Sequence, residues 1–69
     1  MPVLVFKTSV KYKYQVKHLA FALDSLIREG TWNFDLDDCD NILRVETESI
    51  SGAEVISLMK QLGHNCEDL

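Results

Sequence analysis

The feature that most constrains the fold is a set of apolar side chains with helical spacing in the first half of the chain. Between residues 14 and 28 they recur at Val16, Leu19, Ala20, Leu23, Leu26 and Ile27. An α-helix has about 3.6 residues per turn, so this spacing places them on one face. The pattern predicts an amphipathic helix over residues 14–28 that packs against a second apolar layer. Gly30 follows at a position typical of a left-handed helix end.

A second helix is predicted near the carboxyl end of the chain. Ser51 and Glu54 have the spacing of a capping box, in which each side chain accepts a hydrogen bond from the backbone amide of the other residue. An apolar stripe follows at Val55, Leu58, Met59 and Leu62. Gly63 then ends the predicted helix.

β-Branched and aromatic residues predict strands at residues 3–8, 32–37 and 42–46, and a short last strand at 64–67. The order is therefore strand, helix, strand, strand, helix, strand. With right-handed crossovers this order predicts an α+β, ferredoxin-like βαββαβ sandwich, whose antiparallel sheet carries both helices on one face. The 69 residues suffice for one domain, residues 1–69.

Alternation along the strands assigns each side chain to one face of the sheet. The helix-covered face is expected to hold Leu4, Phe6, Trp32, Phe34, Leu43 and Val45. The open face is expected to hold Val3, Val5, Lys7, Asn33, Asp35, Ile42, Arg44 and Glu46. On that face Val3, Val5 and Ile42 would form a small exposed apolar cluster, which offers one route to self-association.

Charge is distributed unevenly along the chain. Residues 1–28 carry a net charge of +4 and residues 29–69 carry −8, which gives the overall −4. An acidic protein without stacking aromatics on its open sheet face is not expected to bind nucleic acid. The apolar runs of the chain, such as residues 3–6, are too short for membrane insertion, and no secretory signal is recognisable. A cytoplasmic location is therefore expected.

No combination of residues points to catalysis. No spacing places a base beside a nucleophile, and the three glycines form no phosphate-binding loop. A domain of this size also has little room for a pocket that excludes water. We therefore do not expect an enzyme, and no cofactor is required.

Residues 16–23 and 54–64, together with the order of the elements, resemble the heavy-metal-associated domain of small copper chaperones and of metal-pumping ATPases. The resemblance implies the ferredoxin-like fold and, in that family, a Met-x-Cys-x-x-Cys loop whose thiolates bind Cu(I). Here the methionine place is Val10, and the cysteine places are Tyr12 and Gln15. None of these residues supplies a thiolate. The implied fold carries over to this chain, and the family's metal site does not.

Two cysteines and a histidine offer a substitute metal site. In the expected topology the loop after the first strand, the hairpin tip and the turn before the last strand share one end of the sheet. Cys39 would lie at the hairpin tip, with His64 and Cys66 at the turn and on one face of the last strand. Such a set would suit Cu(I) or Zn(II). The alternative is two free thiols, with Cys66 as a small core residue.

The segment at the place of the metal loop carries alternating cationic and aromatic side chains. Its members are Lys11, Tyr12, Lys13, Tyr14, Gln15 and Lys17. Tyrosine is a favoured anchor at interfaces, and lysine attracts acidic partners. In the family that the chain resembles, donor and acceptor domains dock at this edge. The resemblance therefore implies a protein partner, such as a metal-transport protein, or a second copy of the chain. A loop without a selected role is the alternative.

Overall fold

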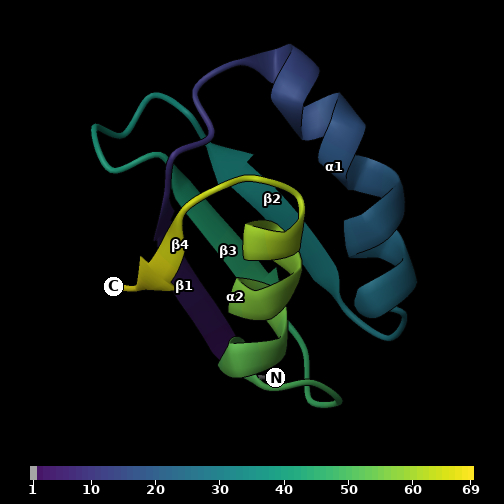
Figure 1. Cartoon of the computed structure of the whole chain (residues 1–69). Helices are drawn as coiled ribbons and strands as arrows, with labels where there is room; N and C mark the ends of the chain where they lie inside the picture. The colour runs from purple at the N-terminus through teal and green to yellow at the C-terminus, as the bar shows by residue number, and fades with distance from the viewer. Residues whose placement is uncertain (1) are drawn as a thin grey trace.

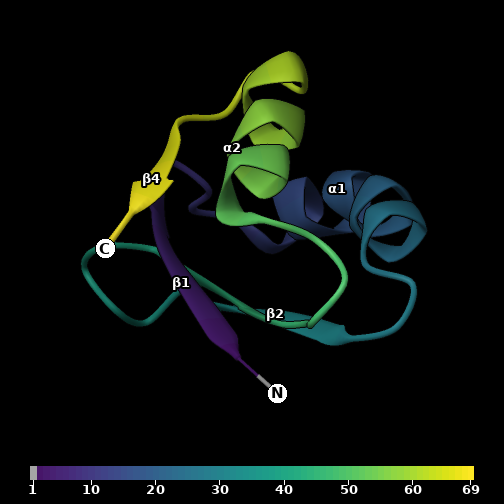
Figure 2. The ribbon, with the colours of Figure 1, turned by 90° about the horizontal axis from the view of Figure 1, so that it is seen from below.

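The computed structural model describes residues 2–69 as a four-stranded sheet with two helices. The elements are β1 (Val3–Thr8), α1 (Lys13–Leu26), β2 (Thr31–Asp35), β3 (Ile42–Glu46), α2 (Gly52–Gln61) and β4 (Cys66–Asp68). The strands lie in the order β2-β3-β1-β4, and each neighbouring pair is antiparallel. Both helices cover the same face of the sheet (Figures 1 and 2). The predicted ferredoxin-like fold is confirmed.

The core lies between the sheet and the two helices. Its buried residues are Phe6, Val10, Leu19, Leu23, Ile27, Leu43, Val45, Val55, Met59 and Cys66. Burying one large apolar side chain of this kind contributes about 1.5–3 kcal/mol. Trp32 and Phe34 pack against this core but are only partly buried, because β2 is an edge strand.

The start of α2 has the predicted capping box. The Ser51 Oγ accepts a hydrogen bond from the Glu54 amide at 3.3 Å, and the Ser51 amide donates to the Glu54 carboxylate at 2.9 Å. The helix buries Val55 and Met59. Leu62 was predicted to belong to the same apolar stripe, yet it is 43% exposed. The reason is that α2 ends at Gln61, so Leu62 already turns away from the core.

The other boundaries differ from the prediction by one to two residues: α1 covers 13–26, β2 ends at residue 35 and β4 covers 66–68. Within residues 2–69, no helix has the length and apolar character needed to cross a membrane.

Gly30 does not form the predicted left-handed helix end. Within residues 2–69, positive φ angles occur at Asn41 (51°) and Gly63 (87°). α1 ends through Ile27, whose amide donates to the Leu23 carbonyl. Gly30 is needed instead for a close approach, because a Cβ at this position would collide with the Glu46 carbonyl oxygen. A glycine after a helix has both uses, and its sequence position alone does not separate them.

Ile42 is buried, whereas it was predicted to be part of an exposed cluster on the open face. Only 2% of its surface is exposed. Its cross-strand neighbours are Lys7 and Asp35, and both are held in ion pairs. Cross-strand side chains on one face lie within contact distance, so the long stem of Lys7 and the carboxylate of Asp35 can shield the isoleucine. The exposed apolar surface of that cluster is reduced to Val3 and the half-buried Val5.

We expect Gly30→Ala to lower the free energy of unfolding by at least about 2 kcal/mol, because backbone must move to relieve the collision with Glu46. Gly52→Ala is the matched control, since its Cβ would meet Asp68 and Phe6 only at ordinary contact distances. Urea unfolding of both variants followed by circular dichroism provides the measurement. Equal stability of the two variants would contradict the role given to Gly30.

Candidate functional site

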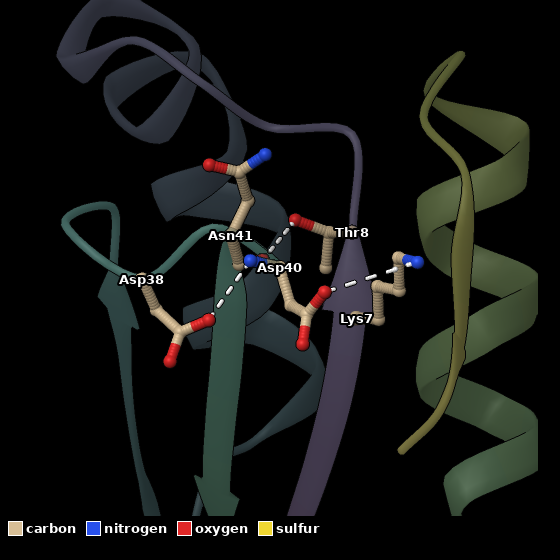
Figure 3. A network of polar contacts seen from close by, with 5 residues as sticks. All are labelled: Lys7, Thr8, Asp38, Asp40 and Asn41. Atoms are coloured by element: carbon tan, nitrogen blue, oxygen red, sulfur yellow. Dashed lines mark hydrogen bonds and ion pairs between the residues drawn. The ribbon is translucent and has the colours of Figure 1, made fainter.

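Three loops meet at one end of the sheet, as predicted. The Thr8 amide donates to the Asp40 and Asn41 carbonyls at 3.2 Å each, and the Thr8 hydroxyl donates to the Asn41 carbonyl at 2.7 Å (Figure 3). The Ser9 amide donates to the Asn65 carbonyl at 3.2 Å, and the Asn65 amide donates to the Ser9 hydroxyl at 2.9 Å. The end of β1 therefore holds both the hairpin tip and the turn before β4.

The hairpin tip is built by its own acidic residues. The Asp38 carboxylate accepts a hydrogen bond from the Asp40 amide at 2.8 Å, and the Asp40 carboxylate lies 3.8 Å from the Lys7 ammonium (Figure 3). Within residues 2–69, Asp38, Cys39 and Asp40 form the one group of three potential ligands whose ligand atoms lie within 4.8 Å of one another. The contacts of these acids account for the turn itself.

The three predicted metal ligands do not form such a group. Cys39 is exposed at the hairpin tip, and His64 is half-buried in the turn before β4. Cys66 is only 4% exposed and lies in the core, opposite Thr8 in the sheet. His64 and Cys66 lie two positions apart in the sequence, whereas Cys39 belongs to a different loop. Metal binding by these three residues stays a prediction.

Burial gives the Cys66 thiol the character of an apolar core side chain. The pKa of this thiol is raised from 9.0 to about 11, first by desolvation and then by the nearby charges of Asp68 and Glu67, which Lys60 partly opposes. The thiol is therefore protonated at neutral pH. A metal would have to displace this proton and draw the sulfur out of the core.

Cys66 should make the stability of the protein depend on pH in the alkaline range. Because the folded chain holds the thiol proton more tightly, this contribution is complete below pH 9.0 and is lost as pH rises through about 11. Relative to Cys66→Ala, the parent protein should lose about 2 kcal/mol of unfolding free energy between about pH 8 and 11. Urea unfolding across this range measures the difference, and parallel curves for the two proteins would refute it.

The substitute metal site is tested by titrating the reduced protein with Cu(I) and with Zn(II) against a competing chelator, followed by native mass spectrometry. With Cys39, His64 and Cys66 placed as described, we expect no ion to be retained. Retention of one ion per chain, lost in both Cys39→Ser and Cys66→Ser, would instead establish the site. The double variant serves as the control for adventitious binding.

The start of α1 is fixed by the side chain of Gln15. Its Oε1 accepts hydrogen bonds from the amides of Lys11 at 2.8 Å and Tyr12 at 3.0 Å. These are amides that a helix start leaves without a backbone partner. Gln15 was predicted as an interaction residue, and its side-chain oxygen is already engaged in holding the two residues before the helix.

Exposed aromatic rings follow one outer stripe of α1. The rings of Tyr12 and Tyr14 are stacked, with centroids 5.7 Å apart and planes inclined by 8°. Tyr14 also meets His18 edge-on at 6.0 Å. Tyr14, His18 and Phe21 are spaced four and three residues apart, which places them on one side of the helix. The tyrosines are 57% and 59% exposed, and Phe21 is 84% exposed.

Sequence reasoning missed Phe21 as a candidate site residue. The apolar stripe that faces the core dominates the helical pattern, and Phe21 lies outside that stripe. The usable signal was a second periodicity, in which Tyr14, His18 and Phe21 repeat on the opposite side of the same helix.

Three lysines surround these rings. Lys11, Lys13 and Lys17 are exposed. The ion pairs within residues 2–69 are Lys7–Asp40 and Arg44–Asp35, so these three lysines have no such partner there. The first turn of α1 contains no acid. Together these side chains form the outer α1 surface, which consists of Lys11, Tyr12, Lys13, Tyr14, Lys17, His18 and Phe21.

Comparisons of the chain with protein-family models, curated proteins and solved structures give no match. The resemblance to the heavy-metal-associated domain thus rests on the order of elements and on residues 16–23 and 54–64.

Proposed function

We propose that the protein is a non-enzymatic interaction module that binds an acidic partner protein through the outer α1 surface. The observation that carries this proposal is the row of exposed rings on a helix whose opposite side fills the core. Phe21, at 84% exposure, contributes nothing to that core.

Exposed aromatic rings are unfavourable in water and favourable in an interface. Tyrosine and phenylalanine supply large contact areas with few rotatable bonds, and they are enriched at the centres of interfaces. Two stacked tyrosines and Phe21 lie along about two turns of one helix. A contiguous aromatic row of this kind is typical of a docking surface, whereas single scattered apolar residues are common on any protein.

The charge around the rings favours an acidic partner. Lys13 and Lys17 stand within the first two turns of α1 and Lys11 just before it, where the helix dipole adds positive potential. The chain as a whole carries −4, so this surface differs in sign from the rest of the molecule. Complementary charge speeds the encounter with an acidic protein and weakens as salt is added.

The resemblance to the heavy-metal-associated domain supports the same edge. In that family, docking between domains takes place beside the metal loop, and here Tyr12 and Gln15 occupy the places of the thiolates. The proposal is that docking has been kept without the ion. A metal-transport protein in the cytoplasm is one partner that fits this history, and a second copy of the chain is another.

Site-directed photocrosslinking tests the proposal. Benzoylphenylalanine is placed at Phe21 or at Tyr14, with Ser57 on the exposed side of α2 as the matched control. In the protein's native cells, ultraviolet light should join positions 14 and 21, but not 57, to one discrete protein. A higher salt concentration should lower the yield of this crosslinked product. A product of twice the mass of the chain would identify a second copy as the partner.

Equal products from all three positions, or none from positions 14 and 21, would overturn the proposal. Phe21→Ser provides an independent test in which loss of binding can be told apart from loss of folding. Because this side chain is exposed, the substitution should change the free energy of unfolding by no more than about 0.5 kcal/mol while it removes the interaction.

A further inference from the structure

We propose that the free edge of β2 binds an extended, acidic segment of a partner protein as a fifth strand, with the apolar side chains of that segment in a groove between β2 and α1. The inference rests on the proposed function for the existence of a protein partner. It specifies a second contact, on the side of α1 that faces the sheet edge.

The two edges of the sheet differ in how well they are protected against strand addition. β4 is three residues long, and Glu67 and Asp68 are exposed on it. Short, charged edges discourage pairing with another chain. β2 is five residues long, pairs with β3 alone and contains neither proline nor lysine. The edge at β2 is therefore the one that is open to a further strand.

The backbone of β2 has unpaired groups at defined positions. The Thr8 amide donates to Asn41 and the Thr47 amide donates to Pro2, which fixes the alternation of hydrogen bonds between β1 and β3. It follows that Asn33 directs its backbone groups toward β3. Trp32 and Phe34 then direct their amides and carbonyls toward the free edge. These are the groups that an added strand would bond.

A groove of about 660 Å³ runs along this edge. Its apolar lining comes from Val16, Trp32, Phe34 and Leu36. Trp32 and Phe34 meet edge-to-face with centroids 6.0 Å apart, and the Trp32 indole donates to the Asp24 carboxylate at 2.8 Å. The aromatic floor is thereby fixed in place. Alternate side chains of an added strand would point into this groove.

The charges that line the groove favour an acidic occupant. Lys13 and Lys17 form its wall on α1 and have no ion-pair partner within residues 2–69. Asp35 and Asp37 also line the groove, but Arg44, another lining residue, lies 3.6 Å from the Asp35 carboxylate and compensates its charge. The Asp24 carboxylate is occupied by the indole. The charged side chains that line the groove are thus three cations and two acids, a net charge of +1 that favours an acidic segment: Lys13, Lys17 and Arg44 against Asp35 and Asp37.

A synthetic peptide, Glu-Ile-Glu-Phe-Glu-Ile-Glu, is the probe, added to the full-length, isotope-labelled protein and followed by amide NMR. Binding should slow hydrogen exchange of the Trp32 and Phe34 amides at least about tenfold. The Asn33 amide, which already faces β3, should change little. Two N-methylated versions of the peptide block alternate amides. Only the version that blocks the amides facing β2 should lose binding.

In the double variant that combines Lys13→Glu with Lys17→Glu, the affinity for the peptide should fall at least about tenfold. Lys60→Glu on α2 is the matched control and should leave the affinity within about twofold. Thermal unfolding of each variant checks the fold. In Tyr14→Ala with Phe21→Ser, peptide affinity should stay unchanged, which separates the groove from the outer α1 surface.

Strand addition is overturned by the absence of binding up to about 1 mM peptide, by equal loss with both N-methylated peptides, or by binding that leaves the Trp32 and Phe34 amides unprotected. If the groove fails these tests while positions 14 and 21 still crosslink to one protein, the proposed function survives without it. If peptide binding is confirmed and crosslinking fails, the groove is the interaction site and the outer α1 surface is not.

Discussion

Burial of β1 on the helix side is the constraint on which the rest of the molecule depends. β1 lies inside the sheet, with β3 on one side and β4 on the other, and its Phe6 is fully buried beneath the helices. Both neighbours of β1 come from the second half of the chain, which must return to this strand twice to satisfy its backbone. The two helices of residues 2–69 cover one face and leave β2 and its aromatic side chains at a half-covered edge. The groove is thus a direct result of the small size of the domain.

The same strand organises the loops. Thr8 and Ser9, at the end of β1, hold the hairpin tip and the turn before β4 through backbone hydrogen bonds. In the heavy-metal-associated domains that the sequence resembles, the metal loop follows the first strand, at the place of this end of the sheet. In this chain polar contacts and an ion pair between Lys7 and Asp40 occupy the hairpin side of it. The exposed aromatic rings of the described residues, together with three unpaired lysines, lie instead along and just before the neighbouring helix α1.

Local patterns predicted the elements, and contacts between distant residues account for what the sequence did not reveal. Helical and strand periodicities placed β1 and β3 correctly to the residue and the helices to within two residues. Gly30 was misassigned because its partner, the Glu46 carbonyl, is brought near only by the finished sheet. Ile42 was misassigned because its shield comes from the neighbouring strands. Of the predicted interaction residues, Gln15 is used internally. Phe21 was not predicted, because the stronger core pattern of its own helix hid it.

The clamp that Gln15 places on the amides of Lys11 and Tyr12 has a consequence for recognition. Together with the Tyr12–Tyr14 stack, it holds the chain ahead of α1 in one conformation before any partner arrives. Ordering a free loop on binding would subtract conformational entropy from the affinity. Here most of that ordering is completed during folding, so the proposed partner would meet rings that are already in place. Affinity at this surface can then be adjusted by single side chains without remodelling the backbone that carries them.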